Sequence, residues 1–388
     1  MIEYKELKGV IMRKVFISVD CGFDKFKVAV DDRCISFSSK MVDATDMLAS
    51  NNAGVASSNM YIEYNGRTYE FGDSIDEALS LKNNLSKYKE FLDTFRNLSR
   101  FHTDAFHISL LAAIGYAIIA YDRNEELKKS EKIATNLDNI EFAIGIALPH
   151  ESLNEWDNLK GFLKQQHNFN LLLGSLLVKF PFALDFSKAE FLCNSQVISA
   201  FLYEATNDDN VLVDKHSLLP CAIIDAGYKT LGCFEIAGNL AINAAQSNTD
   251  FAMLNVDMIV AERVRQQGRQ DFNYLQVQHH ARGNGRGFIR SSDKEIDVKS
   301  IYKEVLREVC DGLLSYIEHI FSLDDIFSLI ITGGTGVAYA DQITEYMEKY
   351  HRGLKVIITK KPYRGGPEID PMYAIVLGLH KQLQEKYR

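Results

Sequence analysis

No two cysteines in this sequence stand in the C-x-x-C spacing that zinc sites and redox pairs use. The six cysteines are scattered, and several lie inside apolar runs, as Cys221 does in LLPCAIIDAG. Reduced cysteines buried in a core are typical of cytoplasmic proteins. The sequence therefore argues against a cysteine-built metal centre and favours a cytoplasmic location.

The chain also lacks an apolar leader. Its first fourteen residues, MIEYKELKGVIMRK, are polar, so we expect no signal peptide. No apolar run reaches the roughly 18 residues that a membrane-spanning helix needs. We therefore expect no membrane partner.

Basic residues are fewer than acidic ones, 43 Lys and Arg against 52 Asp and Glu. The 388 residues carry a formal net charge of −9, and 46% of them are hydrophobic. An acidic surface repels phosphate backbones on average, so we expect no direct sequence-specific binding of DNA. The length predicts two or more domains with a sizeable core.

Apolar periodicity predicts a mixed α/β architecture. Strands are predicted at 15–19, 26–30, 139–149 and 220–236, a hairpin at 60–73 around Asn65-Gly66, and helices at 104–122, 301–320 and 370–387. The glycine- and arginine-rich stretch 279–295 predicts a loop. Its Arg282, Arg286 and Arg290 could contact DNA, a partner or a neighbouring subunit, but a solvated surface is the simpler interpretation.

One pattern occurs twice, about two hundred residues apart: strand, D-x-G, turn, strand. It is present in VFISVDCGFDKFKVAV (15–30) and in PCAIIDAGYKTLGCFEI (220–236). Glycine at such a bend exposes backbone N–H groups that can cradle phosphate, and an aspartate at the strand tip can hold Mg²⁺ through water. Lys27 is placed to reach a phosphate as a point charge. A single hairpin of this kind reads more simply as a turn with a solvated aspartate, whereas two together favour a polyphosphate clamp.

A third glycine-rich segment, TGGTG (Thr332–Gly336), follows the apolar strand FSLII and precedes a helix. Glycines there allow close approach of a ligand, and a helix N-terminus favours polar or phosphate groups. The segment matches neither the P-loop nor the dinucleotide fingerprint. The alternative is a tight strand-to-helix turn without a ligand.

In this order the three segments resemble the motifs of the actin-like ATPase superfamily. DCGFDKFK resembles phosphate-1, DAGYKTLG resembles phosphate-2, and ITGGTG resembles the adenosine motif. FLCNSQVISAFLYEA lies where the family has its connect-1 segment. DPMYAIVLGL and FAIGIALPHESLNEW resemble segments of the ParM/StbA-like plasmid-segregation actins.

The resemblance implies an α/β protein with the actin-like ATPase (ribonuclease H-like) fold, in which two related α/β domains have a nucleotide cleft between them. Residues 1–11 are expected to be an N-terminal extension. Domain I is expected at 12–215, with phosphate-1 and connect-1, completed by the C-terminal helix 370–388. Domain II is expected at 216–369, with phosphate-2 and the adenosine motif.

The resemblance also implies site residues. The cofactors would be ATP, with GTP as the alternative, and Mg²⁺ organised through water by Asp20 and Asp225. The nucleotide would contact Asp20, Gly22, Phe23, Asp24, Lys27, Gly227, Tyr228, Thr230, Gly333, Gly334 and Thr335. The catalytic residues would be Asp225 and Gln196, the latter at the position where the family orients the attacking water.

A neutral amide such as that of Gln196 can orient water but cannot take its proton. Hydrolysis would then rest on positioning and electrostatics, as phosphoryl transfer mostly does. Taken alone, Gln196 is an ordinary polar residue at a helix start. The sequence departs from the family twice: Gly232 stands where phosphate-2 often has a second aspartate, and the bulky Phe23 stands where small residues are frequent.

The function implied is that of a cytoskeletal ATPase that polymerises into nucleotide-dependent filaments. The partners implied are further copies of the chain and an adaptor protein bound to centromere-like DNA, for plasmid or phage DNA segregation. The alternative is a small-molecule kinase of the same superfamily, which needs a general-base aspartate that connect-1 lacks. A chaperone module and a membrane-linked scaffold would need a peptide-binding domain and an amphipathic anchor, neither of which we expect.

Overall fold

The computed structural model divides into two compact units, each described by itself below. Unit 1 comprises residues 1–75, 83–203 and 375–388, and unit 2 comprises residues 76–82 and 204–374. The residues that the structure describes are 4–7, 10–46, 60–75, 91–92, 100–122, 140–174, 176–212, 218–283, 285–291 and 294–387. The domain boundaries drawn from the family motifs stay a prediction.

The first sheet of unit 1 carries the first D-x-G hairpin. Its strand order is β12-β9-β2-β3-β4, and β1 pairs with β2 outside this path. The strands are β1 (Tyr4–Leu7), β2 (Val10–Cys21), β3 (Lys25–Val30), β4 (Arg33–Ser38), β9 (Ile140–Leu148) and β12 (Glu190–Ser195). β3 is antiparallel to β2 and β4, whereas β9 is parallel to β2 and β12. Part of the expected N-terminal extension is thus a strand of this sheet, since β1 pairs with β2.

A second sheet of unit 1 has the order β11-β10-β6-β7-β5-β8. Its strands are β5 (Met41–Asp43), β6 (Met60–Tyr64), β7 (Arg67–Phe71), β8 (Phe91–Leu92), β10 (Gln166–Leu173) and β11 (Val178–Asp185). The predicted hairpin at 60–73 is confirmed. Asn65 and Gly66 both have positive φ, 50° and 77°, which a two-residue turn matching the strand twist requires.

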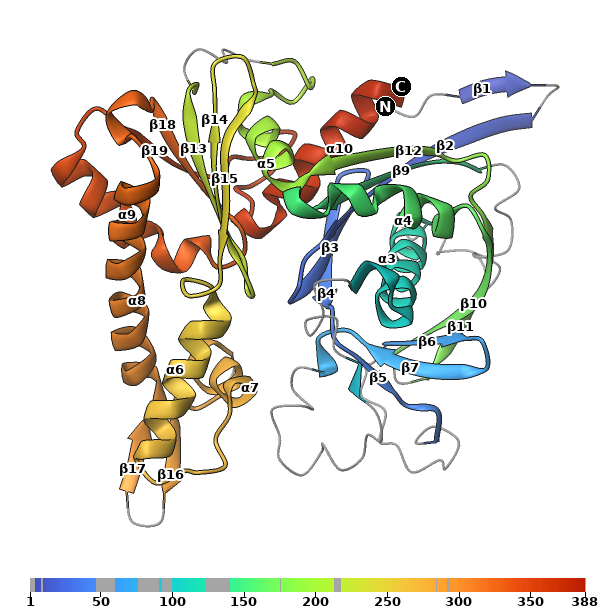
Figure 1. Ribbon diagram of the computed structural model, residues 1–388. Coiled ribbons are helices and arrows are strands. Elements are labelled where there is room, and N and C mark those ends of the chain that lie inside the picture. Colours follow the sequence, from blue (N-terminus) through green and yellow to red (C-terminus); the bar gives the residue numbers. More distant parts are fainter. Residues whose placement is uncertain are drawn as a thin grey trace. The chain divides into compact units, whose positions relative to one another are not determined.

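Helix α3 (Asp104–Asp122) lies between these two sheets and contacts β2, β3, β6 and β10 (Figure 1). Its range matches the predicted buried helix. We expected no apolar run long enough to cross a membrane. That expectation was wrong for α3, because its residues Asp104–Tyr121 are long and apolar enough to cross a membrane. Within the structure, however, 78% of that window is buried, and its side chains form the centre of the unit 1 core.

Among its described residues, unit 1 also contains the helices α4 (Trp156–Leu163), α5 (Gln196–Ala205) and α10 (Ala374–Tyr387). Helices α5 and α10 approach closely where Gly378 faces Ser199. A Cβ atom built on Gly378 would come 1.8 Å from the Ser199 carbonyl oxygen, so this crossing requires glycine. The crossing packs the C-terminal helix against α5, which begins at Gln196.

Unit 2 is built on one sheet with the order β15-β14-β13-β18-β19. Its strands are β13 (Cys221–Ala226), β14 (Leu231–Ile236), β15 (Ile242–Asn248), β18 (Ser328–Thr332) and β19 (Lys355–Ile358). Its helices are α6 (Met253–Gln266), α7 (Tyr274–Val277), α8 (Val298–Ile320) and α9 (Gly336–Tyr350). Helix α9 packs on β18 and β19, and Figure 1 shows α6 beside α8.

The stretch predicted as a loop at 279–295 is only partly irregular: among its described residues, Gly283 and residues 285–287 lie outside helices and strands, and the others do not. Residues Gln278–Arg282 form a π-helical turn, and β16 (Phe288–Ser291) pairs with β17 (Lys294–Asp297) in a hairpin. The hairpin leads into α8, whose N-cap Asp297 accepts a hydrogen bond from the Ser300 amide at 3.0 Å. The prediction failed because glycine and arginine mask the short alternation around buried Ile289.

Candidate nucleotide-binding site

The first D-x-G hairpin places Asp20 near the tip of β2, directly opposite Lys27 on β3. The Asp20 side chain has no exposed surface, and its two oxygens have different partners. Lys27 Nζ lies 3.0 Å from Oδ2, and Gln196 Nε2 donates to Oδ1 at 2.6 Å. Three residues predicted to act together are therefore brought together in unit 1, although they come from strands β2 and β3 and from the first residue of α5.

The bend itself, at Gly22, Phe23 and Asp24, is held by an arginine that sequence reasoning missed. Arg100 lies in a 3₁₀ turn (Arg100–His102) before α3 and is 1% exposed. Its guanidinium donates to the carbonyl oxygens of Cys21 and of Gly22, the latter at 3.1 Å. The guanidinium carbon also lies 3.9 Å from the centroid of the Phe23 ring.

Burial governs the ionisation of the groups behind this bend. It lowers the pKa of Arg100 to about 10, so the guanidinium stays charged at neutral pH. Burial also raises the pKa of the Cys21 thiol, which keeps it protonated and unreactive. The bend therefore has a fixed positive charge on its inner side.

A second missed cation is Lys40, whose side chain is fully buried. Its Nζ lies 3.1 Å from Asp24 Oδ1, while the adjacent Ser39 binds the carbonyl groups of Phe23 and Asp24. No local sequence signal marks Lys40 or Arg100, because each meets the bend only through the tertiary fold. The Phe23 departure from the family has a structural reason, since its ring is the surface on which Arg100 stacks.

In unit 2 the second hairpin places Asp225 on β13, opposite Gly232 on β14 and beside Thr332 on the parallel strand β18. Asp225 is half-buried. A Cβ atom on Gly232 would come 2.4 Å from the Phe234 ring. An aspartate at position 232 would thus require that ring to move, which accounts for the second departure from the family.

The glycine-rich segment after β18 touches this hairpin. Gly333 has φ +87°, and a Cβ there would meet the Ala226 carbonyl oxygen at 2.5 Å and Asp225 Oδ1 at 2.7 Å. The Thr335 amide donates to the Ala226 carbonyl at 3.1 Å, and its hydroxyl lies 2.5 Å from the same carbonyl oxygen and 3.1 Å from Gly227 O. Gly334 has no such crowding, with only Met372 Cβ at 3.4 Å. The predicted phosphate-2 and adenosine motifs are therefore adjacent within unit 2.

The turn between β13 and β14 is closed by its own backbone. The Gly227 amide donates to the Thr230 carbonyl at 3.0 Å, and the Tyr228 carbonyl accepts from the Leu254 amide at 2.7 Å. The Gly227 N–H that we expected to meet phosphate is thus used inside the turn in this structure. Thr230 contributes its carbonyl oxygen to the closure.

The Tyr228 side chain points to an ion pair that the sequence did not reveal. Its hydroxyl donates to Asp257 Oδ2 at 3.0 Å, and Arg282 Nη2 lies 2.5 Å from the same oxygen. Asp257 is completely buried, while 28% of the Arg282 side chain is exposed. Arg282 is exposed at the surface, as expected, but its guanidinium also pairs with a buried carboxylate, which the sequence did not predict.

These residues fit a nucleotide with Mg²⁺ bound through water. Both oxygens of Asp20 already accept one hydrogen bond, and each retains a lone pair that can accept from a metal-bound water. Among the described residues, no three His, Cys, Asp or Glu side chains group to hold a metal directly. The donor set thus suits an ion carried in by phosphates and not a site built by protein ligands alone.

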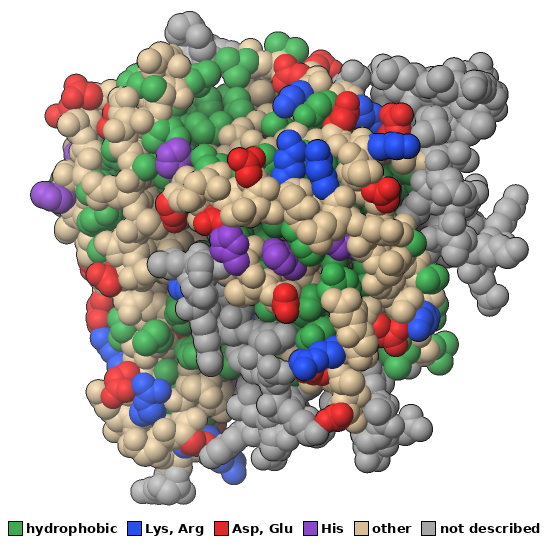
Figure 2. Space-filling view, turned by 45° about the vertical axis from the view of Figure 1, so that its right-hand side comes forward, with side chains coloured by type: hydrophobic (Ala, Val, Ile, Leu, Met, Phe, Trp, Pro, Cys, Tyr) green, Lys and Arg blue, Asp and Glu red, His purple; other side chains and the backbone are tan. Residues whose placement is uncertain are grey.

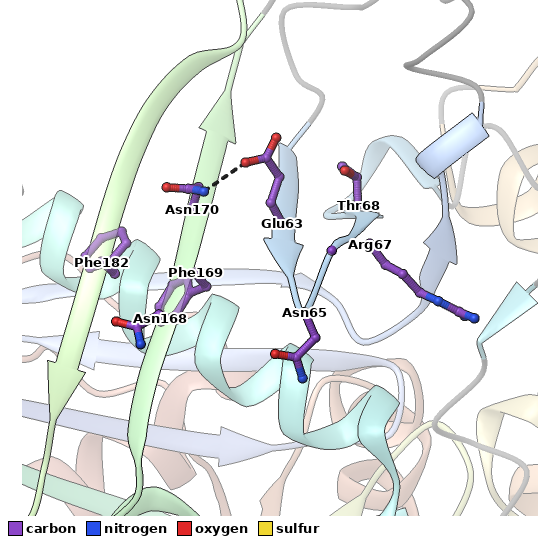
Figure 3. A pocket seen from close by; sticks show the side chains of 9 residues that line it. Glu63, Asn65, Arg67, Thr68, Asn168, Phe169, Asn170 and Phe182 are labelled. Atoms are coloured by element: carbon purple, nitrogen blue, oxygen red, sulfur yellow. Dashed lines mark hydrogen bonds between the residues drawn. The ribbon is translucent and has the colours of Figure 1, made fainter.

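Two cavities in unit 1 are lined by residues outside the first D-x-G hairpin. One, of about 440 Å³, lies at the β6–β7 turn, where Asn170 on β10 donates to Glu63 on β6 at 2.8 Å (Figure 3). The other, of about 650 Å³, is lined by residues including His107, Asp157 and Phe162. Neither is lined by a predicted site residue.

The face in Figure 2 carries acidic and basic side chains interspersed, with histidines gathered across its middle. Among the described residues on that face, no broad patch of Lys and Arg stands out. This distribution suits an acidic chain with no dominant basic surface in view.

Comparison with known proteins agrees with the motifs. Residues 18–176 match the family model for the N-terminal domain of actin-like proteins. No curated protein matches the sequence significantly. The matched region contains the D-x-G bend of the first hairpin and its strand β3.

Solved structures match almost the whole chain. A crystal structure of apo pSK41 ParM is 12% identical, with TM-score 0.63, covering 96% of this chain and 98% of that one. A 15-stranded ParM filament from Clostridium botulinum is 16% identical, with TM-score 0.65 and coverage of 96% and 99%. The archaeal actin homologue Ta0583 in complex with ADP is 14% identical, with TM-score 0.60 and the same coverage. The predicted actin-like fold and the resemblance to ParM-like proteins are confirmed.

Proposed function

We propose that this protein, whose fold and N-terminal domain are actin-like, binds a nucleoside triphosphate with Mg²⁺ and assembles into filaments. Hydrolysis of the bound nucleotide would limit the lifetime of those filaments. The nucleotide is ATP, with GTP as the alternative. The observation that carries the proposal is the pair of D-x-G hairpins, one in each unit.

The residues of unit 1 have distinct tasks in this proposal. Lys27 is a cation 3.0 Å from Asp20 and would exchange that partner for a phosphate oxygen. Asp20 then accepts hydrogen bonds from waters around Mg²⁺, whose charge offsets that of the phosphates. Gln196 donates its amide N–H to Asp20, which leaves its Oε1 to hold the attacking water.

In unit 2, Asp225 takes the second position around the Mg²⁺ waters. The segment Gly333–Thr335 contacts the adenosine, where backbone without side chains allows close approach. Gly227, Tyr228 and Thr230 form the phosphate-2 turn. Because no residue in these roles is a strong base, the rate of hydrolysis depends on positioning and electrostatics.

The self-association proposal draws on relatives, two of which are solved as filaments under the names ParM and Alp12. We further propose a cytoplasmic filament that moves plasmid or phage DNA through an adaptor protein bound to a centromere-like site. The net charge of −9 supports an adaptor over direct DNA contact. The adaptor would then supply the basic surface that contacts the DNA.

The test is right-angle light scattering with parallel phosphate release, using purified protein with Mg²⁺ and ATP, GTP or ADP. We expect scattering to rise with a triphosphate and to decay as phosphate is released. The Asp225→Ala variant should lose the rise or keep filaments that do not decay. No rise across a broad protein concentration range, with phosphate release only when a sugar or acid is added, would contradict the filament and support a small-molecule kinase.

A further inference from the structure

The phosphate-1 bend has its successive carbonyl groups held from within unit 1. Arg100 binds those of Cys21 and Gly22, and the Ser39 hydroxyl binds that of Phe23. The Ser39 amide binds the Asp24 carbonyl at 2.8 Å. The acceptors of the bend are thus satisfied by the protein itself.

This arrangement determines the direction of the amide hydrogens. In a planar trans peptide, the C=O of one residue and the N–H of the next point in opposite directions. Fixing the carbonyls of Cys21, Gly22 and Phe23 therefore turns the amides of residues 22–24 away from Arg100 and Ser39. Because one guanidinium fixes the carbonyls of both Cys21 and Gly22, the amides of Gly22 and Phe23 are turned to the same side, as in the concave anion sites that successive backbone N–H groups form.

Arginine suits this task better than any other residue. Its planar fork can reach two neighbouring carbonyls at once, which a lysine ammonium on a flexible stem does less well. The Phe23 ring, 3.9 Å away, keeps the guanidinium plane in place. A positive charge on the carbonyl side also polarises each peptide unit and strengthens its N–H as a donor.

We propose that Arg100 is a positioning residue that aims the amides of the phosphate-1 bend at the phosphate chain of the nucleotide. It acts through the backbone, without touching the ligand. This inference rests on the proposed function. It states that Arg100, 78 residues from Gly22 in the sequence, strengthens binding of the phosphates and not of the nucleoside.

The test compares Mg-ATP with adenosine in equilibrium binding by calorimetry. Arg100→Met should weaken ATP binding about 30-fold and leave adenosine binding within twofold of wild type, because adenosine has no phosphate. Arg100→Lys, which keeps the charge but not the fork, should weaken ATP binding about fivefold. Loss of fold alone would weaken both ligands equally.

The matched control is Arg33→Met, which removes another guanidinium-to-carbonyl bond of unit 1, to Ala120 at 2.7 Å. It should leave both affinities within twofold. If Arg100→Met does not fold, Arg100→Lys decides alone. Wild-type ATP affinity in the folded Arg100 variants, or an equal loss for ATP and adenosine, overturns the positioning role. Wild-type protein that binds no nucleotide overturns the proposed function as well.

Discussion

The two D-x-G hairpins have the same backbone plan but are stabilised differently. In unit 1, Asp20 is fully buried between Lys27 and Gln196, and Arg100 holds the bend from behind. In unit 2, Asp225 is half-buried, and the hairpin is fixed by backbone bonds and by the close approach of Gly333. Around its aspartate, the first hairpin thus depends on charged side chains, whereas the second depends on a neighbouring glycine that has no side chain.

The difference indicates which substitutions separate stability from function. A buried charge that loses its partner destabilises the fold strongly, whereas a partly solvated one does not. Replacing Asp20 therefore confounds folding with binding. Asp225 is the position at which metal and phosphate binding can be tested in a folded protein.

The largest effect is expected from Asp20→Ala, which leaves the Lys27 ammonium, 14% exposed, without its carboxylate. The free energy of unfolding should fall by about 3 kcal/mol. Asp225→Ala should cost about 1 kcal/mol or less. Urea unfolding of both variants measures the contrast, and equal losses would show that the two aspartates are held alike.

The next effect concerns glycine in unit 2. Gly333→Ala should lower the free energy of unfolding by about 2 kcal/mol, because alanine is strained at φ +87° and its methyl group would clash with Ala226 O. Gly334→Ala is the control and should cost about 0.5 kcal/mol at most. Similar thermal midpoints for the two variants would contradict the role given to Gly333.

Arg282→Met tests whether unit 2 also contains an essential ion pair. The variant leaves the buried Asp257 with the Tyr228 hydroxyl as its hydrogen-bond donor, so we expect a loss of about 2 kcal/mol. Arg263→Met removes an exposed pair with Glu308 and should be nearly neutral. If chemical denaturation shows no difference between the two variants, the Arg282–Asp257 pair contributes no more to stability than an exposed pair does.

Apart from the control variants, the smallest effect should come from Lys40→Met, which breaks the pair with Asp24 but keeps a side chain of similar length. Because Asp24 is 28% exposed, water can replace the lost partner, and we expect a cost of about 1 kcal/mol. Lys25→Met removes the exposed pair with Asp73 and should cost less than about 0.5 kcal/mol. If Lys25→Met lost more free energy of unfolding than Lys40→Met in the same denaturation assay, the pair of Lys40 with Asp24 would not be the more stabilising of the two.

Local patterns in the sequence were sufficient to predict several elements of the fold. The apolar run Asp104–Asp122, the Asn65-Gly66 turn and the repeated D-x-G hairpin depend on neighbouring residues, and each is found where predicted. Arg100 and Lys40 could not be found in this way, because they meet the bend only through tertiary packing. The β16–β17 hairpin was missed for a different reason, since strands of four residues give too short an alternation to recognise.

The most direct test of the account is calorimetric titration of ATP, with and without Mg²⁺, into wild type and Asp225→Ala. We predict that wild type binds Mg-ATP and loses affinity when Mg²⁺ is removed. The folded variant should bind ATP equally weakly with and without the metal. An Asp225→Ala protein that binds Mg-ATP as wild type does, with the same dependence on Mg²⁺, would contradict the assignment of the second hairpin to nucleotide and metal.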